Sequence, residues 1–243
     1  MKKRAFTLAE VLITLGIIGV VAALTMPSLL AEHQKKVLET QLKKFSSATQ
    51  QGLKLAMAKG EVDSLFDLGV NSDAAIKAFI IPMFSFTKDC TGSPANCFAN
   101  SYTNLNGNNI AVYADAQAPC IVSTSGAIAC FKFSATDPAF VWVNPMIADY
   151  AYVPGQLGYI IVDINGKKSP NKLGRDLFVI GFNNDGTLDN YGKDSVGGSP
   201  VMNPPGYIPP TSLEKCQQAI SVNNKNAGFC YEILRQNSYE FNY

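Results

Sequence analysis

The chain has 243 residues, enough for one folded domain or at most two. Apolar residues make up 47% and charged residues 16%, and the net charge is +1. A packed core is therefore expected, whereas a nucleic-acid binder, which would carry a basic surface, is not. The single histidine, His33, excludes sites that need two imidazoles. The sequence also lacks the motifs of phosphate-binding loops, serine hydrolases and zinc peptidases, so we expect no enzyme.

The first 24 residues predict a membrane-spanning helix. Basic residues at positions 2–4 precede an apolar run over residues 6–24 that contains one charge, Glu10. At 1.5 Å per residue this run forms a helix of roughly 28 Å, enough to cross the hydrocarbon core of a bilayer. The basic residues favour a cytoplasmic N-terminus, so the chain after Leu24 is expected outside the cytoplasm.

Glu10 is the unusual residue of this run, because a carboxylate is costly inside an apolar span. It lies near the start of the run, so one interpretation is that its side chain reaches the lipid headgroups. The other is that it awaits a cationic partner within an assembly. Composition alone favours neither interpretation.

Between the basic leader and the apolar helix the chain reads AFTLAE over residues 5–10. This combination resembles the class III signal of type IV pilins and type II secretion pseudopilins. The resemblance implies that a membrane-bound prepilin peptidase cuts between Ala5 and Phe6, methylates the new amine and leaves the apolar helix in place. The family usually has glycine at the position of Ala5. The motif covers about the first 30 residues, and the rest of the chain matches the family only loosely.

The resemblance implies a structural subunit of a type IV pilus-like filament or of a secretion pseudopilus. Its parts would be a leader of residues 1–5, a membrane and filament-core helix of residues 6–27, and an exported globular domain of residues 28–243. Its partners would be other pilin or pseudopilin subunits, the prepilin peptidase and, before assembly, the inner membrane. The filament would lie in the periplasm or at the cell surface.

Cleavage would also supply the missing partner of Glu10. The new amine of Phe6 is a cation, and in a helical bundle it could meet the Glu10 carboxylate of a neighbouring subunit. Two buried charges that are separately costly become tolerable as a pair. Such a pair could set the axial register between subunits, as a buried polar group can.

Two other functions remain open. An ordinary secretory signal peptide could be cut after Ala23, which would release a disulfide-rich binding domain; the long apolar run and Glu10 argue against it. The other possibility is a membrane-anchored enzyme, whose active site would consist of residues that are distant in sequence and that only the fold brings together.

Residues 28–59 predict a continuation of the helix with an amphipathic pattern. Apolar or small side chains recur every three or four residues and form one stripe: Leu38, Leu42, Phe45, Thr49, Leu53 and Ala56. Joined to the membrane segment, this predicts one helix over residues 6–59, roughly 80 Å long. Pro27 should kink or loosen it, and the stripe should pack on a sheet.

The remaining sequence predicts a mainly β domain. A short helix capped by Ser72 comes first, with one apolar face made of Ile76, Phe79, Ile80 and Met83. Strands are expected at residues 110–114, 120–124, 127–133, 140–143, 159–164 and 177–182, and a last helix from residue 211 or 212 to 222. The predicted fold is α+β and pilin-like, with the long N-terminal helix packed on an antiparallel β-sheet.

The cysteine pattern favours disulfides. No two of the six form a CxxC pair, so zinc ribbons are disfavoured: Cys90, Cys97, Cys120, Cys130, Cys216 and Cys230. An even set in a segment outside the cytoplasm predicts three bridges. Proximity in sequence favours the three neighbouring pairs in that order, although fifteen connectivities are possible. Buried free thiols are the alternative interpretation.

A polar loop lies between the two apolar strands expected at residues 159–164 and 177–182. It resembles the strand–loop–strand region of major pseudopilins, some of which bind Ca²⁺. The loop contains Asp163, Asn165 and Asp176, whose oxygens are ligands that suit Ca²⁺. Lys167 stands where an EF-hand loop would carry a ligand, and the same side chains also suit turn hydrogen bonds. A Ca²⁺ site and a simple turn both remain possible interpretations.

Overall fold

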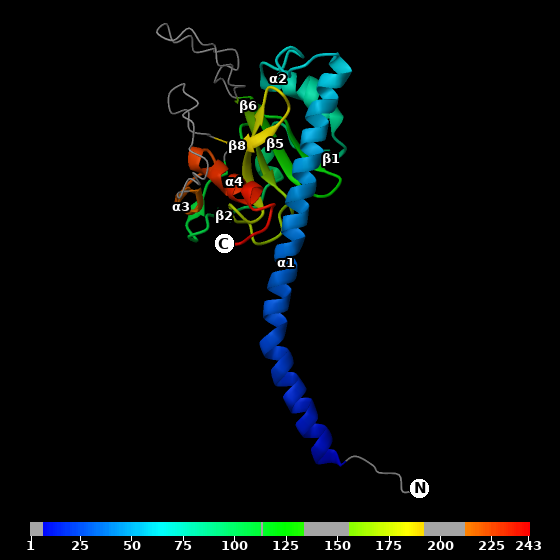
Figure 1. Cartoon of the computed structure of the whole chain (residues 1–243), viewed down its shortest axis with the longest axis vertical. Helices are drawn as coiled ribbons and strands as arrows, with labels where there is room; N and C mark the ends of the chain where they lie inside the picture. Colours follow the sequence, from blue (N-terminus) through cyan, green and yellow to red (C-terminus); the bar gives the residue numbers. More distant parts are fainter. Residues whose placement is uncertain (1–6, 113, 134–155, 192–211) are drawn as a thin grey trace, which may run out of the picture.

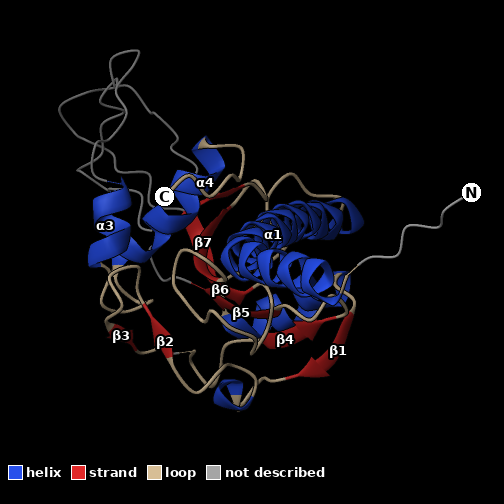
Figure 2. Cartoon of the chain, turned by 90° about the horizontal axis from the view of Figure 1, so that it is seen from below, coloured by secondary structure: helices blue, strands red, loops and turns tan. Residues whose placement is uncertain are grey.

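The structure is a computed structural model that describes residues 7–112, 114–133, 156–191 and 212–243. A long helix, α1 (Leu8–Gly60), lies with its C-terminal half against a six-stranded antiparallel sheet, and its N-terminal half projects away from the domain (Figure 1). In the view from below, α1 covers one face of the sheet (Figure 2). The predicted α+β, pilin-like fold is confirmed.

Helix α1 is continuous over its 53 residues. Pro27 lies inside it without ending it, and the helix bends in its projecting half (Figure 1). The helix ends where Glu61 adopts the left-handed conformation, with φ of 54°, and donates its backbone N–H to the carbonyls of Met57 and Ala58. This left-handed cap donates to carbonyls that the last turn otherwise leaves without partners.

The predicted stripe on α1 faces the core. Leu38, Leu42, Thr49, Leu53 and Ala56 are buried, and Phe45 is half-buried. The same face also buries three residues that the sequence pattern did not single out: Ser46, Gly52 and Met57. A Cβ atom at position 52 would lie 2.6 Å from the ring of Phe84, so glycine is what lets this ring pack against the helix.

The main sheet has the strand order β1-β4-β5-β6-β7-β8, with all neighbours antiparallel. Its strands are β1 (Phe86–Asp89), β4 (Cys120–Ser123), β5 (Ile128–Phe133), β6 (Gln156–Asp163), β7 (Leu177–Asn183) and β8 (Leu188–Asn190). A separate hairpin pairs β2 (Tyr102–Thr103) with β3 (Asn109–Ile110). The central strands β6 and β7 are almost wholly buried, as expected of a sheet covered by helices.

Four of the predicted strands correspond to β4, β5, β6 and β7. The strand expected at residues 110–114 is only the two-residue β3, and the segment 140–143 lies outside the described residues. Strands β1, β2 and β8 were not predicted. Every residue of β1 is exposed, so this edge strand has no buried face to produce an alternating pattern.

The short helix after α1 differs from the expectation in one respect. Ser72 caps α2 (Asp73–Ala75) as predicted, and its side chain accepts the backbone N–H of Ala75. The chain continues as a π-helical turn, η1 (Ile76–Ile80), and a 3₁₀ turn, η2 (Ile81–Met83). Phe79 lies within this π turn, whose i→i+5 bonding changes the spacing of side chains around the helix axis, and it is 41% exposed and not part of the buried face.

The C-terminal region contains, over the described residues 212–243, two α-helices separated by a 3₁₀ turn, where the sequence predicted one helix. Helix α3 (Ser212–Gln218) ends earlier than the expected residue 222 and is followed by η4 (Lys225–Gly228) and α4 (Phe229–Gln236). The last residues then return to α1, where the backbone N–H of Phe241 donates to Glu39 Oε1 at 2.7 Å. Tyr243 packs beside the Arg175 guanidinium and donates to the Gly174 carbonyl.

Three disulfides join cysteines that are close in sequence, the pairing that proximity favoured: Cys90–Cys97, Cys120–Cys130 and Cys216–Cys230. The second joins residues that lie directly opposite each other on β4 and β5. The third joins α3 to α4, and both of its cysteines are fully buried.

Replacing Cys216 and Cys230 together by alanine should destabilise the protein by about 3 kcal/mol, because an unfolded chain without this cross-link gains conformational entropy. The measurement is the free energy of unfolding of the full chain in detergent, from denaturant titrations without reductant. Adding reductant should lower the stability of the wild type more than that of the double variant. Equal stability of the two proteins before reduction would contradict the prediction.

Candidate functional site: the projecting helix and the Asp163–Asp176 loop

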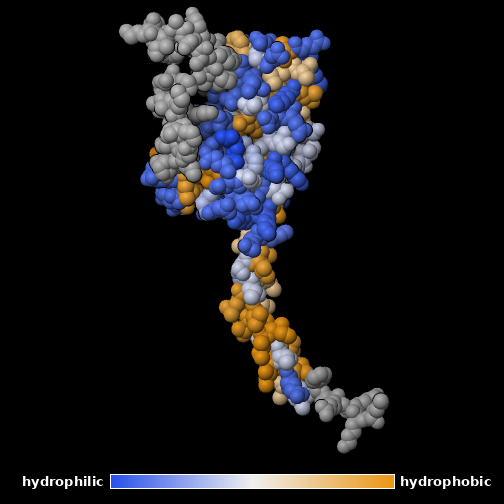
Figure 3. Space-filling view, in the orientation of Figure 1, coloured by the Kyte–Doolittle hydropathy of each residue, from blue (hydrophilic) through white to orange (hydrophobic). Residues whose placement is uncertain are grey.

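The N-terminal half of α1 is apolar and uncovered. None of residues 7–37 is buried, and large apolar side chains along it are mostly exposed, among them Leu24 at 75%. In Figure 3 this half is covered by hydrophobic side chains, whereas the described surface of the domain in that view is mostly hydrophilic. By length and composition α1 can cross a membrane. An apolar surface of this extent needs lipid or protein against it.

The helix begins with a capping box formed by Thr7 and Glu10. The Thr7 backbone N–H donates to Glu10 Oε2 at 2.8 Å, the Thr7 hydroxyl donates to the same oxygen at 2.9 Å, and the Glu10 N–H donates back to Thr7 Oγ1 at 3.3 Å. These bonds satisfy donors that the first turn otherwise leaves free. The Glu10 carboxylate is thereby held at the N-terminal end of the helix.

Thr7 is a site residue that the sequence analysis did not identify. The signal for it is present, since threonine followed three residues later by glutamate before an apolar run is the usual pattern of a capping box. Ala5 and Phe6, the predicted processing residues, lie outside the described residues.

The loop between β6 and β7 brings together the three predicted metal ligands. Asp163 and Asp176 are fully buried. Asp163 accepts the Tyr102 hydroxyl at 2.5 Å and the Asn165 backbone N–H at 3.2 Å. Asp176 accepts the backbone N–H groups of Asn171 and Lys172 at 2.7 and 2.6 Å. The two carboxylates thus serve as turn acceptors.

These carboxylates lie in an unfavourable environment for charge. Burial raises the pKa of Asp163 to about 7; the hydrogen bond from Tyr102 opposes this rise, and the nearby Asp176 charge adds to it. Burial also raises the pKa of Asp176, against the hydrogen bonds from Lys172, Asn171 and the Asn165 side chain. The loop therefore holds two interacting acidic groups that would both gain from a cation.

Two further oxygens in this loop lack partners. The side-chain carbonyls of Asn165 and Asn171 are buried and accept no hydrogen bond from the described residues. Asn171, which the predicted ligand set omitted, adopts the left-handed conformation with φ of 49°. Within the described ranges, no group of three or more His, Cys, Asp or Glu side chains is arranged to hold a metal. Any cation here would depend on the amide oxygens.

The projecting apolar helix on an antiparallel sheet defines a pilin-like class of protein. Comparison with protein families agrees for the N-terminal segment, because residues 1–26 match the prokaryotic N-terminal methylation motif. This motif is the signal of type IV pilins and pseudopilins, so the predicted resemblance is confirmed. No curated protein and no solved structure matches the chain.

Proposed function

We propose that this protein is a structural, non-enzymatic subunit of a type IV pilus-like filament or of a type II secretion pseudopilus. The observation that carries the proposal is an uncovered apolar half-helix of membrane length that begins within the methylation motif. Lipid would cover this surface before assembly, and the helices of neighbouring subunits would cover it in the filament. The disulfide-braced domain would then form the outer surface.

The proposed processing divides the chain into a leader of residues 1–5, a membrane and filament-core helix of residues 6–27 and an exported domain of residues 28–243. A prepilin peptidase would cut before Phe6 and methylate its amine. The capping box starts one residue later, at Thr7, so the helix remains intact after such a cut. The proposed location is the inner membrane, with the domain outside the cytoplasm, and afterwards the filament.

The mature N-terminus tests this proposal. Mass spectrometry of the protein isolated from its membranes should find an N-methylated Phe6. A mature chain that starts at Leu24 would instead indicate a conventional signal peptide and a secreted domain. An intact Met1 would indicate an uncleaved anchor, and either result would contradict the filament proposal.

We also propose that the loop from Asp163 to Asp176 binds Ca²⁺. The supporting observation is that the same loop holds two buried carboxylates and two amide oxygens, those of Asn165 and Asn171, that accept no hydrogen bond from the part of the chain that the structure describes. Ca²⁺ prefers oxygen ligands of this kind. The role of the ion would be to neutralise two acidic groups that the fold otherwise keeps buried.

If Ca²⁺ binds, a hundredfold excess over its Kd should stabilise the full chain by about 2.7 kcal/mol. The melting temperature should rise with Ca²⁺ and fall with a chelator. Asp176→Asn should lose this response, whereas Asp63→Asn, at an exposed position, should keep it. A melting temperature that is independent of Ca²⁺ would leave these residues as turn acceptors only.

A further inference from the structure

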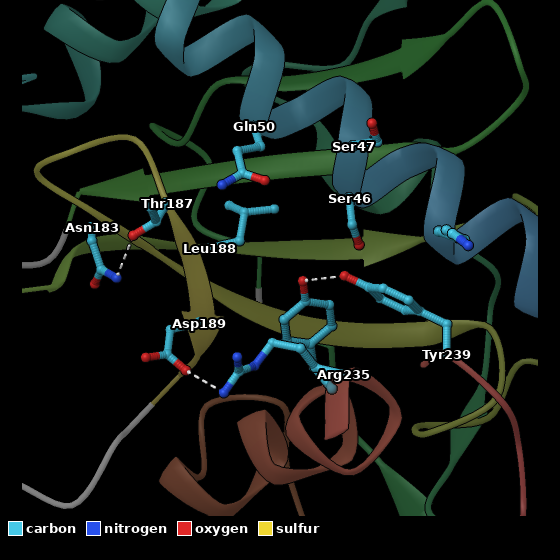
Figure 4. Close-up of a pocket in the computed structure, with 11 residues that line it drawn as sticks. Ser46, Ser47, Gln50, Asn183, Thr187, Leu188, Asp189, Arg235 and Tyr239 are labelled. Carbon is cyan, nitrogen blue, oxygen red and sulfur yellow. Dashed lines mark hydrogen bonds and ion pairs between the residues drawn. The ribbon is translucent and has the colours of Figure 1, made fainter. Parts of the chain in front are cut away.

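A second site lies far from the projecting helix. A cavity of about 540 Å³ opens between α1, the β7–β8 hairpin and α4 with the turn that follows it (Figure 4). This volume falls within the ~300–1,000 Å³ of small-molecule sites. Neither the proposed filament contacts nor the Asp163–Asp176 loop uses it.

The lining of this cavity is polar. Of its eleven residues, only Leu188 lacks a side chain that can form hydrogen bonds. Ser47 and Gln50 contribute a hydroxyl and an amide from α1, and Figure 4 shows the Gln50 amide directed between the helix and the hairpin. Across the cavity Asn183 Nδ2 donates to Thr187 Oγ1 at 3.0 Å. Most small-molecule sites are mainly apolar, so this lining selects a ligand rich in hydrogen-bonding groups.

The guanidinium of the lining, Arg235, is already paired with carboxylates. Arg235 donates two hydrogen bonds to Glu232, at 2.9 and 2.7 Å, and its Nη2 lies 3.7 Å from Asp189 Oδ1. Lys43 is the second cation of the lining. Both carboxylates contact Arg235, so the strongest anion-binding group of the lining is already held, by a bidentate partner and a second carboxylate. A neutral polar ligand fits this arrangement better than a phosphate or a carboxylate.

An aromatic pair forms one wall. The hydroxyls of Tyr231 and Tyr239 lie 3.2 Å apart, and their ring centroids are 6.2 Å apart. Tyr239 and the preceding Ser238 both have positive φ, 68° and 55°. This turn is pinned by the Tyr239 N–H, which donates to the Leu234 carbonyl at 2.6 Å. Such strained backbone tends to occur at ligand sites, and here it holds the half-buried Tyr239 ring at the cavity.

Ser46 lies in the cavity wall beside Tyr231. It is only 4% exposed, and its hydroxyl lies within hydrogen-bonding reach of the Tyr231 hydroxyl. Figure 4 shows this oxygen directed toward the Tyr239 hydroxyl. Ser46 therefore helps to hold the tyrosine pair in place at the wall of the cavity.

We propose that this cavity binds a neutral saccharide unit. The sugar hydroxyls would exchange hydrogen bonds with Ser47 and Gln50, and its C–H face would lie against the Tyr239 ring, whose surface is apolar while its tip is polar. This inference adds a recognition site to the domain and does not depend on filament assembly.

The test uses the full chain in a detergent whose headgroup is not a sugar. Glucose, galactose, N-acetylglucosamine and lactose are titrated separately up to about 10 mM, and saturable binding is followed by saturation-transfer NMR. At least one of these sugars should bind. Ser47→Arg, which extends a long side chain into the cavity from an exposed helical position, should weaken that binding by at least about tenfold.

Ala48→Arg is the matched control. It adds the same side chain one residue further along α1, at an exposed position that does not line the cavity, and should bind the sugar as the wild type does. Three results would overturn the proposal: no saturable binding of any sugar in the panel, equal binding by Ser47→Arg and wild type, or saturable binding of inorganic phosphate in place of sugars. Self-association that Ser47→Arg abolishes, without sugar binding, would assign the cavity to a contact between subunits.

Discussion

Glu10→Ala should abolish incorporation of the protein into filaments while leaving its insertion into the membrane intact. In the proposed assembly the Glu10 carboxylate pairs with the methylated Phe6 amine of a neighbouring subunit, and loss of one partner leaves the other charge unpaired in an apolar bundle. The measurement compares the amount of the protein in sheared filaments with the amount in the membrane fraction.

Glu10→Gln tests the negative charge of residue 10 separately from its role in the capping box. Glutamine keeps a side chain that can close the box with Thr7 but removes the negative charge. If the charge pair matters, this variant should also fail to assemble. Thr7→Val is the complementary control, because it breaks the box and keeps the charge. Assembly of Glu10→Ala at the wild-type level would contradict the pairing role of this residue.

The stability of the protein, measured without Ca²⁺, should fall as the pH rises from about 4 to about 7. The reason is Asp163, whose pKa burial raises from 3.8 to about 7, so in this range the folded state binds a proton that the unfolded state has lost. At ~1.36 kcal/mol per pH unit the loss amounts to at most about 4 kcal/mol. Below pH 4 the contribution is fully present, and above pH 7 it is lost.

Asp163→Asn should remove most of this pH dependence, because the amide is uncharged at every pH and keeps an oxygen that can accept the Tyr102 hydroxyl. The measurement is the free energy of unfolding of both proteins at several pH values, with a chelator present. Asp185→Asn, in the exposed hairpin turn, serves as the control and should follow the wild type. Parallel profiles for wild type and Asp163→Asn would contradict the assignment.

The sequence predicted the structural features that come from a regular pattern of apolar residues along one continuous segment. The stripe on α1 spans many turns of one helix, so its period determines which side chains are buried. Helix α4 was missed although its sequence is amphipathic, because its eight residues are fewer than the window over which a helical period can be recognised. Phe79 was placed wrongly because a π-helical turn changes the direction of its side chain.

The candidate sites also differ in whether the sequence alone could predict them. Glu10 stands out in the sequence because it is a lone charge in an apolar run, and Asp163 and Asp176 flank one loop. The polar cavity combines Ser46, Thr187 and Tyr239, which belong to three segments distant in sequence. Only the packing of the hairpin and α4 against α1 brings these side chains together.

The attachment of α1 to the domain also decides how the protein would carry tension. A pull along the projecting half acts parallel to the face of the sheet, so it shears the buried stripe from Leu38 to Met57 as a unit and does not peel its contacts apart one by one. The hydrogen bond from Phe241 to Glu39 lies at the first turn of this stripe, where the load enters. The segment around Phe241 therefore adds a contact between the domain and α1 at the end of the stripe that would bear the load first.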